Sequence, residues 1–215
     1  MDILYLDNHL LVVRKPAGLL VQGNHTRDEN LLDMGKAYLK VKFNKPGNVF
    51  LGLVHRLDRP VSGVVVFART STSARRLSQQ FRERTVEKHY IALVHGKTPE
   101  NGRLVNHIAR RQTKSRIVNA PHGQRAELTY ERLAYRKGVS SVRVDLATGR
   151  HHQIRVQFAD IGHPVLGDFK YGSRKPFPNR AIALHAQSLT IIHPTKKERM
   201  TFETRPETFW PKSFK

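Results

Sequence analysis

The sequence predicts a domain of mixed strands and helices in which strands are the majority. Short apolar or alternating runs, bounded by Gly, Pro, Asn or Asp, predict about ten strands. Three longer stretches instead repeat their apolar residues at helical spacing. At 215 residues the chain can bury a substantial core, and no repeat or clear linker divides it. We therefore expect a single domain across residues 1–215.

The N-terminal strands form a hairpin in this prediction. Residues 3–6 and 10–13 are apolar and are separated by the turn residues Asp7 and Asn8. Pro and Gly end the second strand and leave Lys15 at its tip, as a solvated lysine or as a functional one. Later strands are predicted at 49–54, 64–68, 87–96, 126–130, 142–146, 181–186, 189–192 and 200–204.

Helical spacing predicts helices over 30–43, 73–83 and 149–161. Asn30 is a suitable N-cap for the first helix. Arginines lie off the apolar stripe of the second helix, either as a solvated face or as contacts to a partner. In the third helix, His152 and Arg155 lie three residues apart, so we expect them to share one face. A surface position is the alternative interpretation of Arg155.

The charge of the chain predicts a polyanionic partner. Lys and Arg number 38 against 17 Asp and Glu, which gives a formal net charge of +21. No apolar run is long enough for a membrane span, and the first residues lack the layout of a signal peptide. Cysteine is absent, so neither a disulfide framework nor a thiolate metal site is expected. We expect a cytoplasmic protein that binds nucleic acid.

Basic residues concentrate in residues 97–125, where the apolar content falls. This composition predicts a basic hairpin or loop that leaves the core. Contact with phosphates and simple solvation are both consistent with it. The basic residues of the segment are Arg103, Arg110, Arg111, Lys114, Arg116 and Arg125.

One acidic residue, Asp58, lies in a short loop between two apolar runs. A loop fixed between buried strands can hold a reactive group in one place. Arg56 and Arg59 flank Asp58 and favour its ionised form, which is an acceptor and a nucleophile. The simpler alternative is an Asp that bonds the N–H groups of its own turn.

Two motifs resemble the RluA-type RNA pseudouridine synthases. The first, His-Arg-Leu-Asp-Arg-Pro-Val-Ser-Gly at residues 55–63, departs from the family pattern by Val61 in place of Thr. The second runs from Gly149 to Val156 and continues through Gly-His-Pro and Gly-Asp to Tyr-Gly at residues 171–172. It departs at His151, which stands for Thr, and at Gln157, which stands for His. The resemblance spans nearly the whole chain.

This resemblance implies an α+β pseudouridine synthase fold, with a mixed, largely antiparallel central sheet flanked by helices and loops. It implies that Asp58 is the catalytic carboxylate and that Arg155 pairs with it and holds it ionised. Tyr90, in a Lys-x-Tyr pattern, would stack on the target base and is a candidate base for the carbon 5 proton, although a strand Tyr is more often a core residue. Arg56 would fill the place that the flipped uridine leaves in the stack. A Lys-Pro-x-Gly loop also matches at Lys15.

The implied partner is structured RNA, either ribosomal or transfer RNA. We expect a monomer that uses no cofactor and no metal, without the small S4 RNA-binding domain that many relatives carry. Its target would be a short stem-loop. The residues expected to contact RNA are Lys15, Arg56, Arg59, Arg110, Arg111, Lys114, Arg116 and His152.

Two other functions compete with this interpretation. A non-catalytic RNA-binding or ribosome-associated protein would explain the charge equally well, but gives no reason for a lone Asp between arginines. A metal-dependent nuclease or phosphatase would use the 12 His residues with Asp58 or Asp168. No His-x-x-x-His or paired-carboxylate spacing supports the second, and adjacent helix residues such as His151 and His152 would point apart. Activity that survives a chelator would exclude it.

Overall fold

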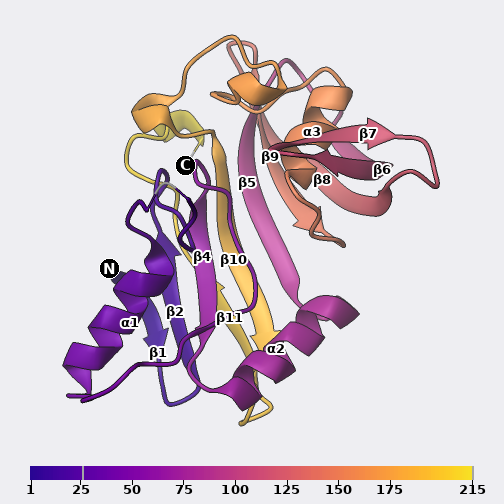
Figure 1. The fold of residues 1–215 in the computed structure, drawn as a ribbon. Coiled ribbons are helices and arrows are strands. Elements are labelled where there is room, and N and C mark those ends of the chain that lie inside the picture. The colour runs from indigo at the N-terminus through magenta and orange to yellow at the C-terminus, as the bar shows by residue number, and fades with distance from the viewer. Residues whose placement is uncertain (26, 215) are drawn as a thin grey trace. The chain divides into compact units, whose positions relative to one another are not determined.

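The computed structural model describes residues 1–25 and 27–214, which divide into two compact units (Figure 1). Unit 1 contains residues 1–86 and 186–205, and unit 2 contains residues 87–185 and the C-terminal residues from 206 on. The described residues form eleven strands and three α-helices. We predicted a single catalytic domain over residues 1–215, and that the two units act together in this way stays a prediction.

Unit 1 is a sheet with two helices. Its strands follow the order β1-β2-β4-β10, and β3 and β11 pair with β4 and β10. β2 and β4 are antiparallel from Leu10 opposite Ala68 to Lys15 opposite Gly63. The elements are β1 (Asp2–Leu6), β2 (Leu10–Lys15), α1 (Leu31–Lys42), β3 (Gly52–Leu53), β4 (Ser62–Ala68), α2 (Ser71–Glu83), β10 (Leu184–Ile192, of which the first two residues belong to unit 2) and β11 (Arg199–Glu203).

The core of unit 1 follows the apolar runs of the sequence. All seven residues of β4 are buried, as expected for a strand that packs on both faces. Leu77 of α2 packs with Val64 and Val66 in the same cluster. Asn30 caps α1 as predicted, because its side chain accepts a hydrogen bond from the N–H of Asp33.

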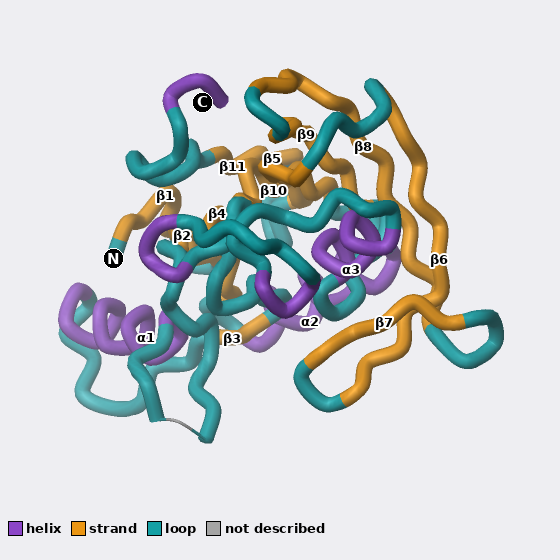
Figure 2. Tube along the Cα trace, turned by 90° about the horizontal axis from the view of Figure 1, so that it is seen from above, coloured by secondary structure: helices purple, strands orange, loops and turns teal. Residues whose placement is uncertain are grey.

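Unit 2 is an antiparallel sheet in the order β5-β9-β8-β6-β7 with one α-helix. The predicted mixed, largely antiparallel α+β architecture is therefore confirmed. The basic segment, residues 97–125, contains β6, β7 and the first two residues of β8, and Figure 2 shows β7 beside β6, joined by a loop. The elements are β5 (Glu87–His95), β6 (Asn101–Arg111), β7 (Lys114–Val118), β8 (Gln124–Arg136), β9 (Val139–Leu146) and α3 (Gln153–Asp160).

Three predicted elements differ most from those of the structure. α3 begins at Gln153, because His152 has a left-handed backbone (φ 55°) and cannot continue a helix before it. The strand before Asp58 is reduced to β3, whose two residues pair with the end of β4. The two strands predicted within residues 181–192 are the single strand β10, because its polar residues Gln187 and Ser188 keep the extended backbone.

No helix within the described residues combines the length and the apolar character needed to cross a membrane.

Candidate active site

Asp58 lies at the start of a tight turn in unit 1 that leads directly into β4. The N–H of Val61 donates a hydrogen bond to the carbonyl of Asp58 (3.1 Å), and β4 begins at the next residue. Val61 is 3% exposed, so the turn is closed by backbone and apolar burial where the family pattern has a Thr hydroxyl. The backbone of Asp58, whose side chain is half-buried, is thereby held beside a buried strand.

Lys15 joins this turn to the loop that follows β2. Its ammonium donates to the carbonyls of Pro16 (3.0 Å), Leu19 (2.7 Å) and Arg59 (3.1 Å). The N–H of Gly18 also donates to the carbonyl of Arg59 (2.7 Å). Lys15 is 0% exposed, so the interpretation of Lys15 as a solvated surface lysine was wrong. Its contact with RNA stays a prediction. Its side chain fixes the backbone one residue beyond Asp58.

Arg56 and Arg59 are exposed and contact the segment that follows the Lys15 loop. Arg56 Nη1 donates to the side-chain oxygen of Gln22 (3.3 Å). Arg59 Nε donates to the carbonyl of Gly18 (2.9 Å), and its Nη1 forms an ion pair with Asp28 (2.7 Å). Both arginines remain accessible to a polyanion, and their RNA contacts stay predictions.

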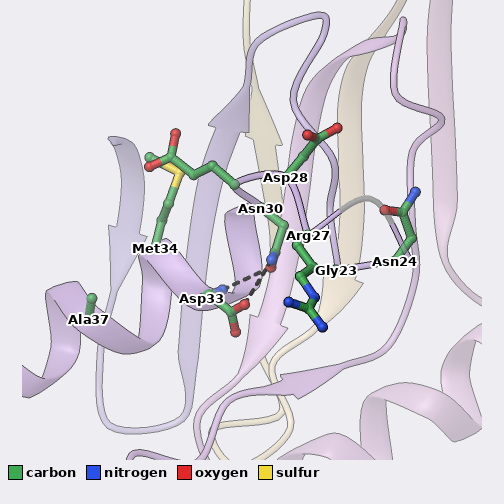
Figure 3. Close-up of a pocket in the computed structure, with 9 residues that line it drawn as sticks. Gly23, Asn24, Arg27, Asp28, Asn30, Asp33, Met34 and Ala37 are labelled. Carbon is green, nitrogen blue, oxygen red and sulfur yellow. Dashed lines mark hydrogen bonds between the residues drawn. The ribbon is translucent and has the colours of Figure 1, made fainter.

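The segment containing Asp28 forms a surface pocket of about 560 Å³ with the start of α1 (Figure 3). Figure 3 shows the amide of Asn30 bonded to Asp33, which fixes the helix start on this side. The lining is mainly acidic and amide side chains, with Arg27 as its basic residue. None of the residues predicted from the sequence as catalytic or RNA-binding lines this pocket.

His55 anchors the motif to its surroundings, a role that the sequence did not reveal. The N–H of Val66 in β4 donates to His55 Nε2 (3.0 Å), so this nitrogen carries no proton here. The ring also stacks on Phe81 of α2, with centroids 4.9 Å apart. His55 therefore ties the residues before Asp58 to both the strand and the helix.

Tyr90 lies in unit 2, on β5, opposite Val144 of β9. It is half-buried, and its neighbour His89 is paired with Asp145 across the same two strands. The strand position follows the prediction. Its contact with a target base stays a prediction.

Arg155 is 5% exposed and forms a two-point ion pair with Asp168, which is 1% exposed. Nε lies 2.6 Å from one carboxylate oxygen and Nη2 lies 2.9 Å from the other. The interpretation of Arg155 as a surface helix arginine was therefore wrong. Asp168, in the Gly-Asp part of the second motif, was missed as its partner. Since Asp58 belongs to unit 1 and Arg155 to unit 2, their proposed pairing stays a prediction.

His152 does not share a helix face with Arg155, because it precedes α3. Its ring stacks on His151 with centroids 3.7 Å apart, so the expectation that these rings point apart was also wrong. His152 Nδ1 and the hydroxyl of Tyr171 are hydrogen-bonded (2.8 Å). Burial raises the pKa of Tyr171, although the N–H of Ser115 and the charge of Arg155 oppose that shift.

The four predicted RNA-binding cations of the β6–β7 hairpin are all exposed. They are Arg110, Arg111, Lys114 and Arg116. Lys114 Nζ lies 5.3 Å from the centre of the Tyr171 ring. Within the described part of the chain, no three His, Cys, Asp or Glu side chains are grouped so as to hold a metal ion.

Comparisons with known proteins agree with these motifs. The family described as RNA pseudouridylate synthase matches residues 9–160. The chain is 40% identical to the dual-specificity RNA pseudouridine synthase RluA of Haemophilus influenzae, over 96% of this chain and 94% of that protein. It is 33% identical to the ribosomal large subunit pseudouridine synthase C of Vibrio cholerae, over 92% of this chain but only 63% of that protein.

A solved structure has the same fold. Human RNA pseudouridylate synthase domain containing 4 superposes with a TM-score of 0.80 at 26% sequence identity. The match covers 97% of this chain and 89% of that one. With its two motifs, its fold and these relatives, the chain belongs to the RNA pseudouridylate synthase family, as an RluA-type member.

Proposed function

We propose that this protein converts specific uridines of structured ribosomal or transfer RNA to pseudouridine, with Asp58 as the catalytic carboxylate. Family membership supports the reaction, and the names of the relatives include a dual-specificity enzyme and a ribosomal large subunit enzyme. The net charge of +21 suits a substrate whose affinity comes mainly from phosphates.

The reaction is an isomerisation and consumes no co-reactant. The bond between C1′ of the ribose and N1 of uracil breaks, the base rotates, and C5 bonds to C1′. C5 then loses its proton and N1 gains one, so the atoms balance. The enzyme must supply an ionised carboxylate, a site that excludes water and an acceptor for the C5 proton.

The observation that carries the proposal is the way Asp58 is held. Its turn is closed by Val61, and Lys15 and Gly18 both donate to the carbonyl of the next residue. A carboxylate on a backbone fixed at three points is positioned before substrate arrives, which lowers the entropic cost of the reaction. Asp58 would act as a nucleophile on the sugar or base, or assist departure of the base.

Other roles follow from the family pattern. Arg155 would pair with Asp58 and keep it ionised, since a nearby cation favours the charged carboxylate. Tyr90 would stack on the uracil and is a candidate acceptor for the C5 proton. Arg56, whose guanidinium is exposed, would stack in the place that the flipped nucleotide leaves.

The test compares Asp58→Asn with wild type on total RNA from cells that lack the protein. Pseudouridines would be mapped by carbodiimide modification and primer extension. We expect wild type to restore specific pseudouridines and Asp58→Asn to restore none while binding the same RNA within threefold. Asp2→Asn is the matched control, because it removes an exposed carboxylate that lies outside both motifs and pairs with Arg14, which is not an expected RNA contact.

The addition of wild type also distinguishes this function from that of a non-catalytic RNA-binding protein. A binding protein would leave the pseudouridine map of the deletion cells unchanged when wild type is added. Full product formation by Asp58→Asn would show that another group is the catalytic carboxylate.

A further inference from the structure

Unit 2 has a pocket at the place where the chain crosses over β6, between the β6–β7 hairpin and the start of β8. β6 pairs with β7 on one edge, where Arg110 lies opposite Ser115, and with β8 on the other, where Ile108 lies opposite Gln124. The connection between β7 and β8 must therefore pass over β6. Gly123 makes that crossing, and a Cβ there would lie 2.9 Å from the Ile108 carbonyl carbon.

This crossing borders an open pocket of about 410 Å³ with Ile108 and Ala109 in its lining. Its other sides come from the hairpin, from residues 122–124 and from the segment before α3. The volume is within the range of small-molecule sites and much larger than a single phosphate requires. A ligand with both an anionic part and a ring would fill it.

The charge of the pocket is positive. Its two charged side chains are Arg110 and Arg150, and no carboxylate residue lines it. Each arginine is oriented through Nε, which donates to the carbonyl of Gln112 (2.9 Å) or of Arg125 (3.1 Å). Within the described residues, their terminal nitrogens have no protein acceptor, so two oriented guanidinium groups remain for a phosphate.

His151 lines the pocket, and its ring is held in place. The buried Ser115 hydroxyl donates to the carbonyl of His151 (2.7 Å) and bonds its Nδ1 (2.8 Å), while His152 stacks on the ring. A held imidazole offers a surface on which a base can stack. Gln124 adds an amide, which can both donate to and accept from the edge of a base.

We propose that this pocket binds one unpaired nucleotide of the RNA substrate, other than the uridine that is isomerised. The arginines would hold its phosphate, and His151 and Gln124 would hold its base. The inference rests on the proposed function for the identity of the RNA. It assigns His151, a departure from the family pattern, to substrate recognition.

The pocket can be tested with a mononucleotide. Affinities of the full chain for uridine 5′-monophosphate and for inorganic phosphate would be measured by calorimetry at equal ionic strength. Arg110→Gln/Arg150→Gln removes the two pocket charges. Arg136→Gln/Lys137→Gln is the matched control, because it removes two exposed charges of unit 2 that neither line the pocket nor are expected to contact RNA.

We expect uridine 5′-monophosphate to bind at least tenfold more tightly than phosphate. The pocket double variant should lose at least tenfold of that affinity, and the control variant less than twofold. Equal losses in the two double variants, or equal affinity for phosphate and the nucleotide, would overturn the proposal. Melting temperatures would confirm that both variants are folded.

The location is tested by crosslinking 4-thiouridine 5′-monophosphate and mapping the modified peptides. We expect crosslinks at residues 108–110, 122–124 or 150–151, in addition to any at residues 54–63. Crosslinks confined to residues 54–63 would contradict the pocket. Because this map needs no turnover, a failure of the proposed reaction would leave it unchanged, and the two failures are distinguishable.

Discussion

Arg155 and Asp168 form a buried ion pair that joins the two halves of the second motif. The guanidinium meets both carboxylate oxygens, at 2.6 and 2.9 Å, across 13 residues of chain. Asp168 also closes the following turn, since its carbonyl accepts from the N–H groups of Tyr171 and Ser173. The pair thus fixes α3 and the segment after it as one piece, and it orients the side chain proposed to act with Asp58.

Asp168→Asn should be strongly destabilising. It leaves the Arg155 charge buried without its counter-ion, and breaking a buried pair from one side costs about 3–5 kcal/mol. Urea unfolding followed by circular dichroism would measure the loss. Arg155→Gln/Asp168→Asn should lose less unfolding free energy than the sum of the losses in the two single variants, because it removes both charges.

The matched control is Glu131→Gln, which breaks the half-exposed pair between Arg143 and Glu131 on the same sheet of unit 2. Exposed pairs contribute about 0–1 kcal/mol. If Asp168→Asn cost no more than this control, the buried pair would not be what holds the segment.

Lys15→Met should destabilise unit 1 and reduce turnover together. The substitution keeps the volume but removes the Lys15 donor from three carbonyls, of which that of Arg59 keeps the Gly18 N–H; each buried carbonyl left unsatisfied costs about 1–3 kcal/mol. Because one of these carbonyls belongs to Arg59, the turn that carries Asp58 should loosen, and kcat should fall more than KM rises. Unfolding curves and steady-state kinetics would measure both effects.

Lys36→Met is the control for Lys15→Met. Lys36 is partly exposed, and its ammonium lies 3.9 Å from the Asp33 carboxylate, a long ion pair, so its loss should change the unfolding free energy by less than about 0.5 kcal/mol. A Lys15→Met protein with wild-type stability and lower RNA affinity would instead indicate direct RNA contact.

Local rules were enough to predict several elements. Asn30 before an amphipathic run predicted α1 and its cap, and the continuous apolar run predicted the fully buried β4. The family motifs predicted which residues to consider as a site. Each of these depends on residues that are near one another in the sequence.

Features that depend on distant residues were not predictable. Lys15 is buried only because the loop after β2 returns to meet the carbonyl of Arg59, 44 residues away. The left-handed backbone of His152 carries no signature in the sequence, since the segment around it has helical spacing. Asp168 was seen as part of a motif, but its partner is set by how α3 packs.

Gly63→Ala should prevent normal folding of unit 1 or destabilise it by several kcal/mol. Gly63 has φ +127°, and a Cβ there would lie 2.2 Å from the carbonyl oxygen of Ala186 in β10. The nearest atoms at this point belong to the backbone of β10, so the clash cannot be relieved by rotation of a flexible side chain. Soluble yield and thermal unfolding would measure the effect.

Gly138→Ala provides the comparison, because Gly138 also has a positive φ (+77°) but an added Cβ would meet nothing within 4 Å. Only the backbone preference is lost there, about 1–2 kcal/mol. Similar losses in the two variants would show that the approach of β4 to β10 does not require glycine.

The ionised carboxylate of Asp7 should stabilise the folded state, and this contribution to the unfolding free energy should be lost in acid. Burial alone would raise the pKa of Asp7, but hydrogen bonds from the N–H groups of His9 and Leu10, and from His193 and Tyr5, lower it below its ordinary value of 3.8. A group whose folded pKa is lowered stabilises the folded state fully above its unfolded pKa. That contribution is therefore present above about pH 3.8 and is lost as the pH falls through the folded pKa.

The measurement is the difference in unfolding free energy between wild type and Asp7→Asn, taken at intervals from about pH 5 to about pH 2.5. The amide cannot ionise, so the variant lacks this contribution at every pH, and the difference should shrink as the pH falls. Asp2→Asn is the control, because Asp2 pairs with Arg14 at an exposed position. A difference for Asp7→Asn that stays constant below pH 3.8 would mean that the ionised carboxylate contributes nothing to the N-terminal hairpin.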